Sequence, residues 1–169
     1  MLVSLNMRQQ AYAPEAGHFP ICLITVNHST LTEPIRISTD PTERIAEYTT
    51  DTEVVYGTYS RGNTFLFLPV RLKLPDDQDE GPGDMTLELD NVHGTYVETI
   101  RSITSPPTVS VEMVMSNALD TVDAQWPLFK LTNVSYDAST ITGTVKFPTL
   151  DTEPEPSGTF TPGAFPGLA

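Results

Sequence analysis

The chain has 169 residues, with 22 acidic and 9 basic side chains, a formal net charge of −13 and a pI near 4.3. Counterion-release binding needs clustered Lys and Arg, so this charge argues against sequence-specific nucleic-acid binding. No apolar run approaches the ~20 residues of a membrane-spanning helix, and the apolar stretch among the first residues is too short for a signal peptide. Both observations favour a cytoplasmic protein with no membrane attachment.

The chain length and the distribution of proline predict one globular domain with two external arms. We expect an N-terminal arm over residues 1–18, a β domain over residues 19–148 and a proline-rich, extended arm over residues 149–169. The single cysteine, Cys22, excludes an internal disulfide. Its apolar neighbours favour a buried structural thiol over a reactive one.

Most segments between Phe19 and Phe147 alternate with a period of two and are rich in Thr, Val, Ile and Tyr, which predicts half-buried antiparallel strands. The predicted strands cover residues 21–28, 34–38, 52–59, 64–74, 85–90, 108–115, 126–131 and 140–147. The first two are expected to form an opening hairpin. Pro69 predicts a bulge or a sheet edge within the 64–74 strand, because proline donates no ladder hydrogen bond.

An acidic turn over residues 75–84 joins two of these strands into a long hairpin. Its carboxylates are Asp76, Asp77, Asp79, Glu80 and Asp84. We interpret them as a solvated hairpin tip, since charged side chains remain hydrated there. Binding of a hard cation such as calcium is the alternative, although the spacing does not match an EF-hand loop.

One helix is predicted from Val92 to Ile103, where apolar residues recur at near-helical spacing after a capping Asp90 or Asn91. With the strands, this helix predicts a mainly β fold. The expected architecture is an antiparallel β-sandwich or barrel with one flanking helix, a long acidic hairpin and an extended C-terminal arm.

The C-terminal arm holds too few core-type side chains to fold alone. Proline fixes φ and removes a backbone donor, so the arm is expected to be an extended strap that docks on another surface. The candidates for inter-subunit contacts are Phe160, Pro162, Phe165, Pro166 and Leu168.

The motifs that mark catalytic, metal-binding or cofactor-binding sites are absent: no Gly-x-Ser-x-Gly, Walker loop, His-Glu-x-x-His or Cys-x-x-Cys occurs. No enzyme activity, metal or cofactor is therefore expected. Three histidines lie far apart in sequence and are interpreted as turn or surface residues: His18, His28 and His93. Four aromatic residues are interpreted as core side chains rather than as a carbohydrate platform: Tyr48, Tyr56, Tyr59 and Trp126.

Four strings taken in order carry a family resemblance: His28 to Asp40, Leu89 to Ser102, Tyr136 to Gly143 and the closing Thr161 to Leu168. Together they resemble the phage tail family catalogued as domain of unknown function 1833. The resemblance extends from Ile21 to the end of the chain.

This resemblance implies a structural virion protein, made in the cytoplasm of the host bacterium and incorporated into the phage tail. A minor tail or tail-tip component of this kind is expected to form a homo-oligomeric ring, hexameric rather than trimeric, at the distal-tail or baseplate junction between tail tube and tip. Its expected neighbours are the tail tube, the tip or hub and the tape-measure protein.

Two other functions remain open. A carbohydrate- or receptor-binding β-sandwich module of the tail tip would place exposed aromatic rings together on one face or loop end. A tail-tip hydrolase would require His28 or His93 to meet an acid and a nucleophile in one cleft.

Overall fold

The computed structural model describes residues 3–48, 53–74, 77–78, 81–82, 85–90, 103, 105–136 and 140–146. Several predicted features lie outside these residues. They are the predicted helix apart from Ile103, the C-terminal arm with its five contact candidates, and the acidic residues Asp76, Asp79, Glu80 and Asp84.

The described part of the chain is mainly β, as predicted. Its elements are α1 (Leu5–Tyr12), β1 (Pro20–Asn27), β2 (Ile35–Ser38), β3 (Glu43–Tyr48), β4 (Glu53–Ser60), β5 (Asn63–Phe67), β6 (Val70–Lys73), β7 (Asp77–Gln78), β8 (Gly81–Pro82), β9 (Met85–Asp90), β10 (Thr108–Met115), β11 (Ala118–Tyr136) and β12 (Thr140–Lys146). Ten strands form one mixed sheet in the order β3-β4-β5-β2-β1-β10-β11-β12-β9-β6, and β7 pairs with β8. Within the large sheet only β2 and β5 pair in parallel.

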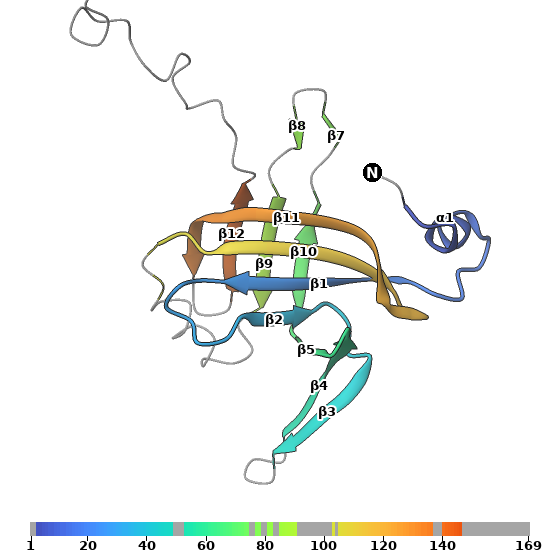
Figure 1. Ribbon diagram of the computed structural model, residues 1–169, viewed down its shortest axis with the longest axis horizontal. Helices are drawn as coiled ribbons and strands as arrows, with labels where there is room; N and C mark the ends of the chain where they lie inside the picture. Colours follow the sequence, from blue (N-terminus) through green and yellow to red (C-terminus); the bar gives the residue numbers. More distant parts are fainter. Residues whose placement is uncertain are drawn as a thin grey trace, which may run out of the picture.

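The large sheet folds over itself into two layers. Strands β2, β1, β10 and the first part of β11 form one layer, and β12, β9 and β6 run across it behind (Figure 1). β11 belongs to both layers, because it pairs with β10 along residues 118–130 and with β12 along residues 130–136. The sheet is not closed into a barrel, so the predicted sandwich-like form is confirmed.

Two bulges bend β11 where it passes between the layers. Pro127 and Leu128 face the single residue Ser110 of β10, and Leu128 has a φ of 63°. Further on, the register between β11 and β12 shifts again at Asn133, which has a φ of 52°. An extra residue increases the local twist and turns a strand, so these bulges account for the change of direction.

The main core fills the space between the two layers. Its buried side chains come from β1, β2, β10 and β11 on one side and from β9 and β12 on the other: Ile24, Val26, Ile37, Val109, Val111, Phe129, Met85, Leu87, Leu89, Ile141 and Val145. A smaller core lies on the other side of β1, where Ile21 and Leu23 pack with Phe65 and Val114. β1 is therefore buried on both faces, which explains its nearly continuous apolar sequence.

The β4–β5 hairpin is held against β10 and β11 by polar contacts at its turn. Arg61 and Gly62 both have positive φ, as a two-residue type I′ turn requires. The Arg61 guanidinium forms two hydrogen bonds with the Glu112 carboxylate, at 2.5 and 3.1 Å, and this contact raises the pKa of Arg61. The Arg61 backbone N–H donates to Asp120 Oδ1 at 2.6 Å. These contacts compensate the cost of a left-handed arginine.

Helix α1 precedes β1, and the Asn6 side-chain amide donates to Asn117 Oδ1 of the β domain at 3.0 Å. Ser4 caps it, because its Oγ accepts from the Met7 backbone N–H at 3.1 Å. None of the eight residues is buried, and the Leu5 and Tyr12 side chains are 64% and 89% exposed. An isolated helix of this length is marginal in water, so α1 presents apolar surface that the described chain leaves uncovered.

Three sequence predictions need correction. Residues 64–74 do not form one strand, because Pro69 divides them into β5 beside β2 and β6 at the far edge beside β9. The strand Glu43–Tyr48 was not predicted, and β11 begins at Ala118 rather than at Trp126. The antiparallel β1–β2 and β6–β9 pairs confirm the predicted opening hairpin and long hairpin.

Candidate functional site

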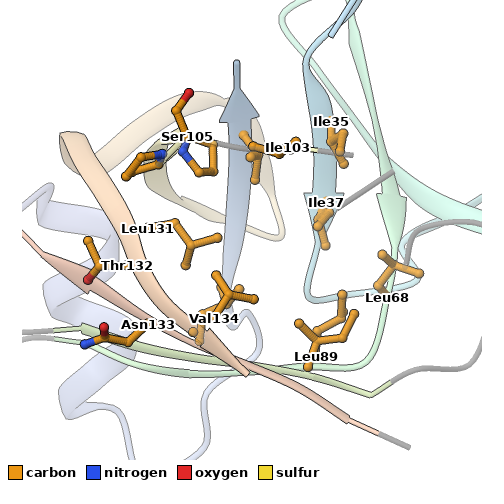
Figure 2. A pocket seen from close by; sticks show the side chains of 16 residues that line it. Ile35, Ile37, Leu68, Leu89, Ile103, Ser105, Leu131, Thr132, Asn133 and Val134 are labelled. Atoms are coloured by element: carbon orange, nitrogen blue, oxygen red, sulfur yellow. The ribbon is translucent and has the colours of Figure 1, made fainter. Parts of the chain in front are cut away.

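An apolar groove lies at one end of the sandwich. Its volume is about 520 Å³, and 16 of the described residues line it (Figure 2). Sites of 300–1,000 Å³ hold a small molecule or a few side chains, so the groove is large enough to bind a partner. We call it the end groove.

The end groove is formed by elements that are far apart in the sequence. Figure 2 shows Leu131 and Val134 of β11 on one side and Ile35, Ile37 and Leu68 on the other. Residues of β9 and β12 also line it, together with Ile103 and residues 105–107 before β10. No described lining residue is charged, although the chain carries 22 acidic side chains.

The second bulge of β11 gives the groove wall its shape. Asn133 and Val134 both lie opposite Gly143 of β12 and have no Cα partner of their own in that strand. A Cβ on Gly143 would lie 2.5 Å from Leu131 Cδ1, so glycine lets Leu131 cover the backbone of β12. The bulge therefore places backbone polar groups beside an apolar wall.

A histidine–serine pair lies at the rim of the groove. His28 Nε2 is 2.6 Å from Ser105 Oγ, and its Nδ1 is 2.7 Å from Thr30 Oγ1. Ser105 also lines the groove. A base next to a hydroxyl in a cleft is the arrangement used in nucleophilic catalysis, so the direction of each hydrogen bond decides what this pair does.

In its hydrogen bond with Ser105, His28 is the donor, whereas a general base must be the acceptor. The Thr30 backbone N–H donates to Nδ1 at 3.2 Å, so Nδ1 is an acceptor and the neutral ring carries its proton on Nε2. Nε2–H therefore donates to Ser105 Oγ and has no lone pair to remove the serine proton. We interpret the pair as a clasp that joins the β1–β2 turn to the segment before β10.

We expect Ser105 to be inert toward a fluorophosphonate that labels activated serines. Intact-mass spectrometry of the treated protein should show no adduct, with chymotrypsin as the positive control. An adduct on Ser105 that disappears in the variant His28→Ala would show that the pair is a catalytic dyad after all.

The other sequence-predicted residues do not form a site in the described part of the chain. Of the acidic tip only the backbone of Asp77 is described, in β7. His18 and His28 are half-buried residues next to turns, and His93 lies outside the described residues. Burial raises the pKa of the Cys22 thiol, in keeping with a structural role.

No group of three or more His, Cys, Asp or Glu residues that could hold a metal ion occurs among the described residues. Asp123 is 7% exposed, and its Oδ1 has no hydrogen-bond partner. It lies in β11 next to a register shift between Met113 and Val114 of β10. Without neighbouring ligands, a single carboxylate is not a cation site. Within the described chain, no helix has the length and apolar character to cross a bilayer.

The aromatic residues divide between core and surface. Trp126 packs against the main core, as predicted. Tyr56 and Tyr59 are each 44% exposed, so their assignment to the core is wrong. They lie three residues apart in β4 and therefore point to opposite faces of the sheet.

Sequence reasoning missed both the end groove and the His28–Ser105 contact. The groove combines short stretches of β1, β2, β9, β11 and β12, so no single segment carries its pattern. His28 and Ser105 are 77 residues apart, and only the β1–β10 pairing brings them together.

A family model described as "Domain of unknown function (DUF1833)" matches residues 6–160. This match covers the described β domain, the end groove and the clasp. No curated protein matches the chain.

Proposed function

Because the chain belongs to the DUF1833 family, we propose that it is a structural virion protein of a bacteriophage tail and not an enzyme. It forms a ring, hexameric rather than trimeric, at the junction between the tail tube and the tip complex. The assignment to a tail comes from the sequence resemblance, and three features of the fold support a role in assembly.

The observation that carries the proposal is apolar surface that the described chain leaves open to neighbours, at the end groove beside the main core and on helix α1. The end groove holds about 520 Å³ between apolar walls, and helix α1 exposes Leu5 and Tyr12. Exposed apolar patches on a soluble protein mark interaction sites. A protein that completes its burial only against neighbours is suited to a permanent assembly.

The sheet edges also support a ring. β3 and β6 end the ten-stranded sheet at opposite positions, so each copy has two different edges. Contacts between unlike surfaces are heterologous and close into a ring when the rotation permits. Arg71 and Lys73 on β6 are exposed and oppose uncontrolled edge pairing in the free protein.

The directions of the His28 hydrogen bonds favour structure over catalysis, because Ser105 Oγ accepts a hydrogen bond from His28 Nε2–H and does not donate its own proton to that nitrogen. The alternative of a carbohydrate- or receptor-binding module lacks comparable support. Tyr56 and Tyr59 point to opposite faces of β4 and cannot form one stacking platform.

The proposal is tested in the phage whose genome encodes the chain. We expect mass spectrometry of purified particles to detect the protein, and electron microscopy to show a ring of it between tube and tip. Particles that lack the gene product should have absent or defective tails, and supplying the wild-type protein in trans should restore them. Normal, infective tails without the protein would overturn the proposal.

A further inference from the structure

We propose that the end groove of one copy binds the uncharged end of the C-terminal arm, residues 157–169, of a second copy. The inference rests on the proposed homo-oligomer and assigns a receptor site to its arm. Three arguments carry it: the size of the groove, the match in polarity and the path of the chain.

The size of the groove suits a short extended segment. About 520 Å³ accommodates a few apolar side chains and is too small for the face of a folded domain. Residues 157–169 offer such side chains in Phe160, Phe165 and Leu168, separated by small residues and proline. Proline-containing segments enter apolar grooves at a low entropic cost, because they are already extended in the free state.

The polarity of the arm matches that of the groove. The chain carries 22 acidic residues, yet residues 157–169 contain no charged side chain. The described lining of the groove is equally free of charge. Burying an unpaired charge in an apolar site is costly, so this uncharged stretch is the part of the arm that the groove accepts. The acidic residues Asp151, Glu153 and Glu155 precede it and remain in solvent.

The wall of the groove also offers hydrogen-bonding groups. An extended proline-containing segment makes no internal hydrogen bonds, so its carbonyl groups need outside donors. At the bulge, neither Asn133 nor Val134 has a Cα partner in β12, and both residues lie close to Leu131 (Figure 2). Ser105, which also lines the groove, adds a hydroxyl. These groups orient a bound segment, and the apolar walls supply its affinity.

The path of the chain allows the arm to reach the groove of a second copy. Ile141 and Gly143 line the groove, and β12 then runs on to Lys146, so the chain leaves the groove before the arm begins. At ~3.1 Å per residue, an extended spacer over residues 147–156 spans about 30 Å. A domain of ~130 residues has a radius of gyration of about 14 Å, so this spacer reaches a neighbour.

Photo-crosslinking of the full-length chain tests the contact. Phe165 is replaced by p-benzoylphenylalanine, and the protein is mixed with an equal amount of ¹⁵N-labelled wild type before irradiation. We expect crosslinks from residue 165 to peptides containing residues 131–134 or 35–37 of the labelled copy. The matched control places the same amino acid at Phe19, which is 51% exposed and lies outside the arm.

A charge in the groove tests the same contact by another route. Val134→Glu places a carboxylate in the groove wall, and we expect self-association to weaken at least about tenfold in light scattering. Leu128→Glu makes the same change on an exposed residue of the same strand and should leave self-association unchanged. Phe165→Ser changes only the arm and should reproduce the loss even if Val134→Glu fails to fold.

The outcomes separate the possible occupants. Crosslinks found only to unlabelled peptides, crosslinks no different from those of the Phe19 control, or unchanged association of Phe165→Ser would each overturn the inference. So would a p-benzoylphenylalanine at Val134 that crosslinks only to residues 91–102. If the arm crosslinks to the groove but the protein is absent from virions, the tail function alone is refuted. If virions contain a ring of the protein but the arm does not crosslink to the groove, this inference alone is refuted.

Discussion

Replacing Gly57 by alanine is expected to destabilise the protein by about 3 kcal/mol or more. Gly57 lies in β4 between β3 and β5 and is buried. A Cβ at this position would overlap the backbone carbonyl oxygen of Phe65 and the Cδ1 atom of Ile45. Because a strand carbonyl cannot move aside as a flexible side chain does, the β4–β5 pairing must distort.

The matched control is Gly17→Ala, because no heavy atom lies within 4 Å of an added Cβ there. Urea unfolding followed by circular dichroism should show a much lower midpoint for Gly57→Ala and a midpoint close to that of the wild type for Gly17→Ala. Equal midpoints for the two variants would mean that β4 and β5 lie further apart than described.

Phe129→Ala is expected to cost about 3–5 kcal/mol, because it removes a large aromatic side chain from the core. Phe129 is 1% exposed and is the largest fully buried side chain in the described chain. It belongs to the main core between the layers. This loss is a large fraction of the free energy of unfolding of a typical native domain, which is about 5–15 kcal/mol.

Leu128→Ala provides the control for Phe129→Ala. Leu128 is the preceding residue in β11 and is 65% exposed, so its truncation should change the free energy of unfolding by less than about 0.5 kcal/mol. Leucine and alanine bear the same penalty at its φ of 63°, so the backbone adds no difference. Equal losses for the two variants would contradict the assignment of Phe129 to the core.

The strands that the sequence predicted correctly are regularly paired ones with one buried face. In β9 the buried residues Met85, Leu87 and Leu89 alternate with more exposed ones, and this pattern is visible in the letters alone. β12 behaves in the same way through Ile141 and Val145. Regular pairing preserves the period of two, so local sequence is sufficient there.

Prediction failed where the pairing is irregular or the segment is charged. The register of β11 against β10 shifts three times, so the side chains before Trp126 lose the simple alternation. β3 is an edge strand with charged Glu43, Arg44 and Glu47, and a half-exposed edge carries no clear apolar face. Helix α1 is held by the Ser4 cap and has no buried face, so its sequence shows no amphipathic period.

The candidate site was even less accessible to sequence reasoning than the fold. The proline-rich arm was predicted to dock on another surface, but the groove that we propose as its receptor combines residues from β1 to β12. The His28–Ser105 contact depends on how β1 and β10 align. Such sites follow from topology, which local patterns do not specify.

The continuity of β11 through both layers has a mechanical consequence. A force that separates the two layers is carried by the covalent backbone of β11. Breaking a single row of hydrogen bonds is therefore not enough to open the sandwich. The ladders to β10 and β12 must shear together. A fold built in this way resists tension across its thickness.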